Sequence, residues 1–363
     1  MHRFKYIDSL RGIAIILVVL HHTHPYFAGI NNYQLPAFFE TFLQNGDKGV
    51  TLFFLMSAFT LCLSLNAKMN CEAHPLRNYF LRRVFRILPL YYFMILLILL
   101  TGVQTPTNYS KLANLLFLHG LSPFWINSTI PGGWSVGIEV LFYLIFPFLF
   151  LRIRSVWSAI NITLIGMLLA KMVTSIMSKH PLINDPILWG VFTYENFISQ
   201  LPIFLIGICL YHISANKYNN ALNPRRYRTY GLIAAFIVLH LLGGNVFKVH
   251  YIFAIAFAFL AFGLSGYPSV LLVNRFTVWI GKLSYSIYLV HLLVAGLLQK
   301  YHLSHYCNNS SMDVMVRFSI IFSISVAVSL LTYNLIEVPF QNWGKRIIEK
   351  LELKAATDSE VVQ

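Results

Sequence analysis

The stretch Ile7-Asp8-Ser9-Leu10-Arg11-Gly12-Ile13-Ala14-Ile15-Ile16-Leu17-Val18-Val19-Leu20-His21-His22 is apolar over most of its length, with Arg11 near its start and His22 at its end. These two residues are eleven positions apart, about three turns of an α-helix, so both lie on one helix face. At ~1.5 Å per residue they are about 16 Å apart along the axis. Because ionisable side chains are costly in lipid, we expect the pair to face a protein interior or a water-filled path.

The whole chain has the composition of a membrane protein. Of its 363 residues 57% are hydrophobic and 11% are charged, whereas roughly a quarter of the residues of a soluble domain are charged. This excludes an ordinary soluble domain and predicts an all-α, polytopic membrane protein with about ten transmembrane helices. The apolar runs place these spans at residues 7–27, 50–67, 87–103, 134–151, 155–176, 198–214, 230–246, 250–267, 284–300 and 318–338.

The basic residues predict the orientation of the spans. If the N-terminus is cytoplasmic, 20 of the 27 lysines and arginines lie in cytoplasmic segments, so the positive-inside rule favours cytoplasmic N- and C-termini. The net charge of +14 then follows from topology and requires no nucleic-acid partner. We expect a multi-pass protein of the plasma membrane, the inner membrane of a bacterium, surrounded by lipid. Residues 1–345 are expected to form one membrane domain with an uncleaved first helix, and residues 346–363 a short cytoplasmic tail.

His22 is the candidate catalytic base, because a neutral imidazole accepts a proton from an alcohol near neutral pH. The span at 134–151 contains a polar stripe of Ser135, Glu139 and Tyr143, spaced four residues apart. Helix directions place His22 and Glu139 in the same half of the membrane. The carboxylate of Glu139 is therefore expected to accept one imidazole N–H and to orient the other nitrogen as the base. The alternative for both residues is a purely structural hydrogen bond.

Two further clusters are candidates for binding a donor. Arg82, Arg83 and Arg86 precede the span that starts at residue 87, and guanidinium groups bind phosphates well. Their alternative role is membrane anchoring or binding of anionic lipid headgroups. Tyr288 and His291 are three residues apart on one helix and are expected to line the same cavity. Interface tyrosines are common, so a structural role is the alternative there.

The remaining motifs are expected to be structural. Pro339 is expected to end the last span, with Glu337 paired to an arginine on the cytoplasmic side. The scattered cysteines have no zinc-type spacing, so no metal site is predicted.

Taken together, the motifs resemble the integral-membrane acyltransferase-3 family over nearly the whole chain. The matching pieces, in order, are Arg11 with His22, residues 49–59, residues 82–89, Trp134-Ser135 with Glu139 and Phe142-Tyr143, residues 284–289 with His291, and Glu337 with Pro339. The resemblance implies a ten-helix bundle that moves an acyl group, usually acetyl from acetyl-CoA, onto a hydroxyl of an extracytoplasmic carbohydrate or lipid-linked glycan. It ties Arg11 and His22 most closely to activity. Thr51 and Ala58 depart from the family, which usually has an acidic residue and a glycine at these positions.

The resemblance and the residues together predict a mechanism. CoA phosphates would bind the arginines of residues 82–86, and the pantetheine arm would pass Arg11 to bring the thioester near His22. His22 would remove a proton from an acceptor hydroxyl, which then attacks the thioester carbonyl. Arg11, Ser135 and Tyr143 are alternatives for stabilising the oxyanion, and Trp134 is a candidate for substrate contact. Direct transfer and an acyl-histidine intermediate both stay open, as does the oligomeric state.

Two other classes of function fit parts of the pattern. In a proton-coupled transporter of a sugar or lipid-linked substrate, His22, Glu139 and His291 would relay protons or bind the solute. The absence of an inverted repeat in the sequence argues against this reading. A non-catalytic membrane assembly subunit is the third alternative, and binding of CoA distinguishes it from an acyltransferase.

Overall fold

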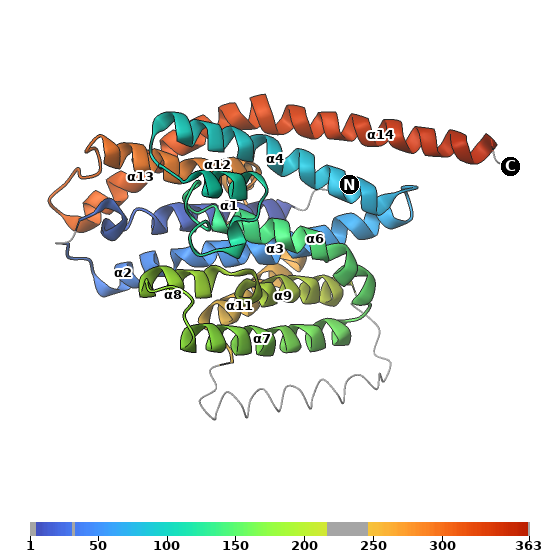
Figure 1. Cartoon of the computed structure of the whole chain (residues 1–363), viewed down its shortest axis with the longest axis horizontal. Coiled ribbons are helices and arrows are strands. Elements are labelled where there is room, and N and C mark those ends of the chain that lie inside the picture. The colour runs from blue at the N-terminus through green and yellow to red at the C-terminus, as the bar shows by residue number, and fades with distance from the viewer. Residues whose placement is uncertain (1–4, 31–32, 216–245, 362–363) are drawn as a thin grey trace.

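The computed structural model describes residues 5–30, 33–215 and 246–361, and every regular element in these ranges is helical (Figure 1). The α-helices are α1 (Lys5–His21), α2 (Ala37–Gln44), α3 (Lys48–Met69), α4 (Pro75–Thr101), α5 (Asn108–Leu115), α6 (Trp134–Arg152), α7 (Val156–Lys179), α8 (Pro186–Glu195), α9 (Phe197–Ala215), α11 (Val249–Gly266), α12 (Arg275–Lys300), α13 (Ser310–Thr332) and α14 (Val338–Val361). Short 3₁₀ turns are η1 (Pro25–Ala28), η2 (Asn45–Asp47) and η3 (His119–Leu121), and η5 (Tyr333–Glu337) is a π-turn. The predicted all-α fold is confirmed.

The predicted spans correspond well to these helices. Nine of the ten coincide with helices of the described ranges, and the tenth, at 230–246, falls almost wholly outside the described residues. Within those ranges, eight helical runs of at least 18 residues are long and apolar enough to cross a membrane. The first helix, α1, has 17 residues and is fully helical through the predicted stretch up to His21. The protein is therefore a polytopic membrane protein.

Helix α4 corrects the position predicted for the arginines. It begins at Pro75, so Arg82, Arg83 and Arg86 lie inside the helix and not in a segment before it. The physical reason is that proline suits the first helical turn, and arginine is a good helix former even where the chain has left the apolar part of the bilayer. Their separation along a rigid helix therefore fixes which arginine faces which neighbour.

Pro339 does not end the last helix, in contrast to the prediction. The chain passes from α13 through the π-turn η5 directly into α14, which continues to Val361. A proline lacks the N–H of the helical ladder and its ring clashes with the preceding turn, and a widened π-turn accommodates both. Residues 346–361, predicted as a tail, are helical, and Figure 1 shows α14 extending past the rest of the bundle.

Helix α1 lies between α12 and α3 (Figure 1), and glycines allow the backbones to approach closely. A Cβ added at Gly281 of α12 would lie 1.7 Å from the carbonyl oxygen of Asp8. One added at Gly12 of α1 would lie 2.1 Å from the carbonyl oxygen of Thr277. Small residues at helix crossings are a common basis of packing in membranes, where lipid provides no hydrophobic driving force. These glycines therefore set the position of α1, which carries Arg11 and leads to His22.

Replacing Gly281 with alanine is expected to lower the free energy of unfolding by about 1–3 kcal/mol, the usual range for overpacking, because the new methyl group meets rigid backbone. The measurement is the thermal unfolding midpoint of the purified protein in detergent. Gly263→Ala in α11 is the matched control, since a Cβ there meets nothing within 4 Å. An unchanged midpoint for Gly281→Ala would contradict the close crossing of α1 and α12.

Ala58 stands where the family that the sequence resembles usually has a glycine, and here the neighbouring helix has a glycine instead. Ala58 of α3 is fully buried, and it faces Gly207 of α9. A Cβ added at Gly207 would lie 2.4 Å from the carbonyl oxygen of Leu55. The small residue that allows these helices to pack closely is thus on α9, opposite the position where the family usually has glycine.

Candidate active site

Three cavities follow one another along α1. The basic cavity, of about 750 Å³, is lined by Arg11, Arg83, Arg86 and Lys282 among others. The middle cavity, of about 40 Å³, adjoins it and shares Arg11 with it. The histidine cavity, of about 450 Å³, lies at the other end of α1 and is lined by His22. The two ionisable residues singled out in the opening stretch therefore lie at different cavities of the same row.

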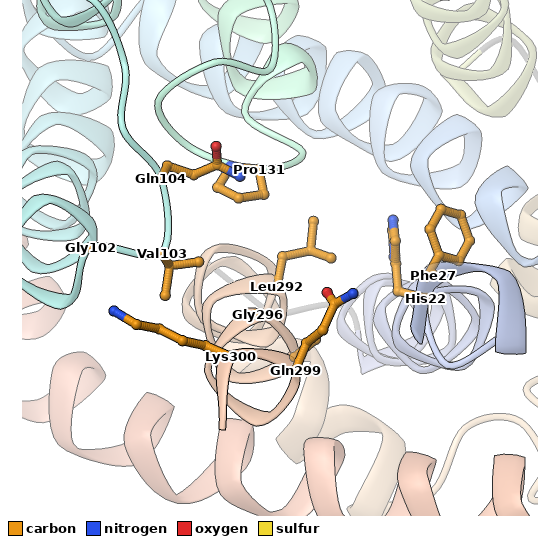
Figure 2. Close-up of a pocket in the computed structure, with 11 residues that line it drawn as sticks. His22, Phe27, Gly102, Val103, Gln104, Pro131, Leu292, Gly296, Gln299 and Lys300 are labelled. Atoms are coloured by element: carbon orange, nitrogen blue, oxygen red, sulfur yellow. The ribbon is translucent and has the colours of Figure 1, made fainter. Parts of the chain in front are cut away.

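Figure 2 shows the histidine cavity. His22 and Phe27 lie side by side on one wall, with their ring centroids 5.2 Å apart, and Lys300 lies on the opposite side. Gln299 and Gln104 add amide groups from α12 and from the segment after α4. The cavity thus combines one imidazole with groups that can donate and accept hydrogen bonds, which suits a polar ligand.

The hydrogen bonds of His22 define which ring nitrogen can act as a base. Its Nδ1 lies 2.9 Å from the carbonyl oxygen of Val18, one turn earlier in α1. A carbonyl only accepts, so Nδ1 carries the proton and Nε2 keeps its lone pair. Within the described residues Nε2 has no hydrogen-bond partner, and the ring lines the histidine cavity. The hydrogen bond from Nδ1 to the backbone of α1 thus leaves Nε2 unprotonated and able to accept a proton.

Within the described residues, the side chain at hydrogen-bond distance from His22 is His291 and not Glu139 as predicted. His291 Nε2 lies 3.3 Å from His22 Nδ1, and His291 Nδ1 donates to the carbonyl oxygen of Ile287 at 3.1 Å. Nε2 of the fully buried His291 is therefore a lone-pair acceptor for the N–H of His22. Tyr288 and His291, predicted to line one cavity, are ring neighbours at 5.6 Å, but Tyr288 lines the middle cavity.

Glu139 belongs to the middle cavity. It accepts hydrogen bonds from Ser57 at 2.5 Å and from Tyr143 at 2.6 Å. The prediction that it orients His22 is thus not supported by the geometry, because α3 supplies a closer polar partner, Ser57, which sequence spacing within α6 could not indicate. Trp134, another candidate of α6, packs against Phe54 in a T-shaped arrangement, with ring centroids 5.9 Å apart.

A hydrogen-bonded contact separates the middle cavity from the histidine cavity. Tyr288 of α12 donates to the carbonyl oxygen of Gly132 at 3.0 Å and accepts from Ser135 at 2.6 Å. Gly132 has a φ of +69°, a conformation that favours glycine, and a Cβ there would lie 2.8 Å from Leu292. We call Tyr288, Gly132 and Ser135 the seal. Gly132 and Tyr288 were not predicted to meet, because they come from elements far apart in sequence.

His119, which the sequence interpretation missed, holds the turn that carries Gly132. Its Nε2 donates to the carbonyl oxygen of Gly133 at 3.1 Å, and it is also 3.3 Å from the Tyr91 hydroxyl. Burial lowers the pKa of His119, which keeps the ring neutral. Its only signal in the sequence is a histidine next to glycine in a loop, which is too common a pattern to identify a positioning residue.

The basic cavity contains two of the three predicted arginines. Arg83 and Arg86 line it, while Arg82 donates from Nη1 to both carboxylate oxygens of Glu72, at 2.8 and 3.1 Å. Arg82 is therefore engaged in an ion pair away from this cavity, since its position on α4 turns it toward the α3–α4 loop. The Nε atoms of Arg11 and Arg83 are buried and have no hydrogen-bond partner within the described residues. The cavity thus offers donor groups to an anion.

Glu337 also lines the basic cavity, and its hydrogen-bond partner is a serine. It accepts from Ser286 of α12, which in turn accepts from Thr332 at 3.2 Å. The predicted pairing with an arginine is not among its hydrogen bonds, because α13 and α12 pack closely enough for the serine to reach it first. Elsewhere in the described chain, no group of three His, Cys, Asp or Glu side chains is arranged to hold a metal ion.

The amino-acid sequence matches a known protein family and several known proteins. A family model described as an acyltransferase domain matches residues 4–334. Two proteins of Staphylococcus aureus, "Putative O-acetyltransferase SACOL0978" of strain COL and "Putative O-acetyltransferase SAS0844" of strain MSSA476, are each 24% identical over 93% of this chain. The chain covers 57% of the length of these two relatives.

A third relative shares a shorter region. "Peptidoglycan O-acetyltransferase OatA" of Listeria monocytogenes is 25% identical over 158 residues, which is 39% of this chain and 23% of that protein. No solved structure matches the chain.

Proposed function

The chain belongs to the acyltransferase domain family, and on this premise we propose that it transfers an acetyl group from acetyl-CoA to a hydroxyl of a glycan or glycolipid. The observation that carries the proposal is that one helix, α1, has a histidine with an unprotonated nitrogen at one end and a cavity lined by arginines at the other. His22 presents Nε2 to the histidine cavity, and Arg83 and Arg86 line the basic cavity. The names of the relatives support acetyl as the group and a glycan as the acceptor.

The basic cavity fits the nucleotide end of the donor. CoA carries a pyrophosphate and a ribose phosphate, which are bound well by guanidinium groups in partly enclosed sites. Arg83 and Arg86 are one turn apart on α4 and can contact neighbouring phosphates, while Lys282 adds a third cation. Positive-inside topology would place this end of the bundle in the cytoplasm, where acetyl-CoA is made.

Arg11 is positioned to hold the pantetheine arm, in preference to the oxyanion. It lies about 16 Å from His22 along α1, too far for one carbonyl to contact both side chains. It lines both the basic and the middle cavity, so its guanidinium group is placed to donate to an amide carbonyl of the arm. The ring of Tyr288 lies 5.6 Å from that of His291, the neighbour of His22, so the seal hydroxyls of Tyr288 and Ser135 replace Arg11 as the oxyanion donors in this proposal.

The chemical step starts when the acceptor hydroxyl meets Nε2 of His22 and the thioester has passed the seal. Nε2 takes the hydroxyl proton, the oxygen attacks the thioester carbonyl and forms the new C–O bond, and the C–S bond then breaks. The proton on Nε2 passes to the departing sulfur, so CoA leaves as the thiol. His291 stabilises the transient imidazolium by accepting the N–H at Nδ1, while the carbonyl of Val18 holds the ring in place.

The middle cavity requires a movement during each transfer. At about 40 Å³ it is too small for a pantetheine arm, since typical ligand pockets measure roughly 300–1,000 Å³. Tyr288 must therefore leave the carbonyl of Gly132 for the thioester to reach His22. Such a rearrangement releases the Tyr288 and Ser135 hydroxyls at the moment when an oxyanion needs donors.

The test of the proposed function is acetyl transfer by the purified protein in lipid nanodiscs. Acetyl-CoA labelled in the acetyl group is supplied together with delipidated envelope glycan, and label in the glycan is followed over time. We expect label that depends on both the protein and its His22. Solute movement without labelled glycan would contradict the proposal and favour a transporter.

Replacing His291 with phenylalanine is expected to lower kcat about tenfold without changing the KM for acetyl-CoA, because it removes the acceptor that stabilises the imidazolium. Glu139→Gln is the comparison, since glutamine keeps an oxygen that accepts from Ser57 and Tyr143. The assay is the labelled acetyl transfer described above. A larger loss of kcat for Glu139→Gln than for His291→Phe would restore Glu139 as the partner of His22.

A further inference from the structure

We propose that the histidine cavity selects an acceptor whose sugar unit carries a carboxylate as well as the reacting hydroxyl, and that Lys300 is the residue that recognises the carboxylate. The acceptor class is therefore an acidic sugar. This inference rests on the proposed function, because it takes the histidine cavity as the place where the acceptor hydroxyl meets His22.

The charge of the cavity wall is the first support. Lys300 is the one lining residue with a permanent charge, and the lining residues include no aspartate or glutamate. A smaller cavity of about 20 Å³ shares His22, Phe27 and Gln299 with it and adds Arg317, again without a carboxylate in its lining. The charge of Arg317 is compensated, because it forms a buried ion pair within α13. The net positive potential in the cavity thus comes from Lys300.

The position of Lys300 is the second support. Its Nζ donates to the carbonyl oxygen of Thr101, the last residue of α4, at 2.8 Å. This bond uses one of three ammonium donors and leaves two for a ligand. Gly102 lies beside the ammonium, and a Cβ added there would be 3.4 Å from Nζ. A tethered ammonium loses little conformational entropy on binding, so an anion gains more from the contact than it would from a freely moving lysine.

The uncharged part of the wall suits the rest of a sugar. Gln104 and Gln299 provide amide groups that can both donate and accept, as hydroxyl recognition requires. Phe27, next to His22, provides an apolar face for the C–H side of a ring. Figure 2 shows Gln299 between His22 and Lys300, so a ligand that reaches both ends passes this amide. The reacting hydroxyl and the carboxylate therefore belong at opposite ends of the ligand unit.

The experiment compares two probes with the same hydroxyls that differ in the charge at C6, p-nitrophenyl β-D-glucuronide and its uncharged C6 carboxamide. The full-length protein in nanodiscs is given labelled acetyl-CoA and either probe, and kcat/KM is measured for both. We expect the wild type to prefer the glucuronide. The variant Lys300→Gln should reduce this preference roughly threefold, the value of one ion pair at an exposed site, since Lys300 is exposed. Lys300→Arg should retain most of the preference.

Lys179→Gln is the matched control, because Lys179 is an exposed lysine at the end of α7 and does not line the cavity. Equal kcat/KM values for the two probes in the wild type, or a preference that Lys300→Gln leaves unchanged, would overturn the role of Lys300. If neither probe is acetylated while envelope glycan is, the probes are compared as inhibitors of glycan labelling, and equal inhibition overturns it as well. Loss of labelling for the probes and the glycan alike overturns the proposed function itself.

Discussion

Replacement of His22 by alanine is expected to lower kcat for acetyl transfer by about 10²–10⁴-fold, the usual contribution of a positioned general base. The reason is that Nε2 is the nitrogen that the Val18 carbonyl leaves unprotonated and that faces the histidine cavity. The measurement is the rate of label transfer from acetyl-CoA to envelope glycan by the purified variant. The KM for acetyl-CoA should change little, since the proposed mechanism binds the nucleotide end of the donor at the opposite end of the row of cavities.

The control for this loss is His302→Asn. His302 is an exposed histidine with a positive φ of 58°, a conformation that asparagine tolerates, and it does not line the histidine cavity. It should keep the wild-type rate. Normal yield and an unchanged unfolding midpoint for His22→Ala would show that the loss is chemical. A variant with more than half of the wild-type kcat would remove His22 from the mechanism.

Simultaneous replacement of Arg83 and Arg86 by glutamine is expected to raise the KM for acetyl-CoA at least tenfold, with a smaller effect on kcat. Each charge-assisted hydrogen bond to a phosphate is worth roughly 1.5–3 kcal/mol, and two are removed. Binding of CoA alone, measured by calorimetry on the protein in nanodiscs, should weaken in parallel. Added salt should weaken wild-type binding more than binding by the double variant.

Arg82→Gln separates phosphate binding from membrane anchoring. It removes a positive charge on the same helix turn, but Arg82 is paired with Glu72 and lies away from the basic cavity. Its KM should stay within about twofold of the wild type, as expected for the loss of one partly exposed ion pair. Equal increases in KM for Arg82→Gln and for the double variant would indicate a general effect of charge at the membrane surface.

Most of the helices could be predicted from the sequence, because a span of some twenty apolar residues has few alternatives to a helix in lipid. The errors lie where local chemistry is ambiguous. The start of α4 could not be placed, because the part of a helix outside the bilayer is often as polar as a loop. The end of α13 was misplaced, because a proline ends a helix unless the preceding turn widens, and the π-turn at Tyr333–Glu337 does this.

The sequence indicated which residues line the cavities better than it indicated which of them contact one another. His22 and Arg11 line cavities along α1 as expected, since their relation depends on the geometry of one helix. The partners of His22 and Glu139 depend on which helices touch and at what height, which the periodicity of a single helix does not contain. His291 and Ser57 therefore emerged from the structure, although His291 had already been singled out as a cavity residue.

The seal has a consequence for the energy balance of the cell. A protein with polar cavities reaching toward both faces of a bilayer would conduct protons if water filled them continuously, and the resulting leak would dissipate the membrane potential. Within the described residues, Tyr288 donates to the carbonyl of Gly132 and Leu292 lies beside the same glycine, between the middle cavity and the histidine cavity. The contact that opens for the thioester in the proposed mechanism would therefore also keep the bilayer insulating between turnovers.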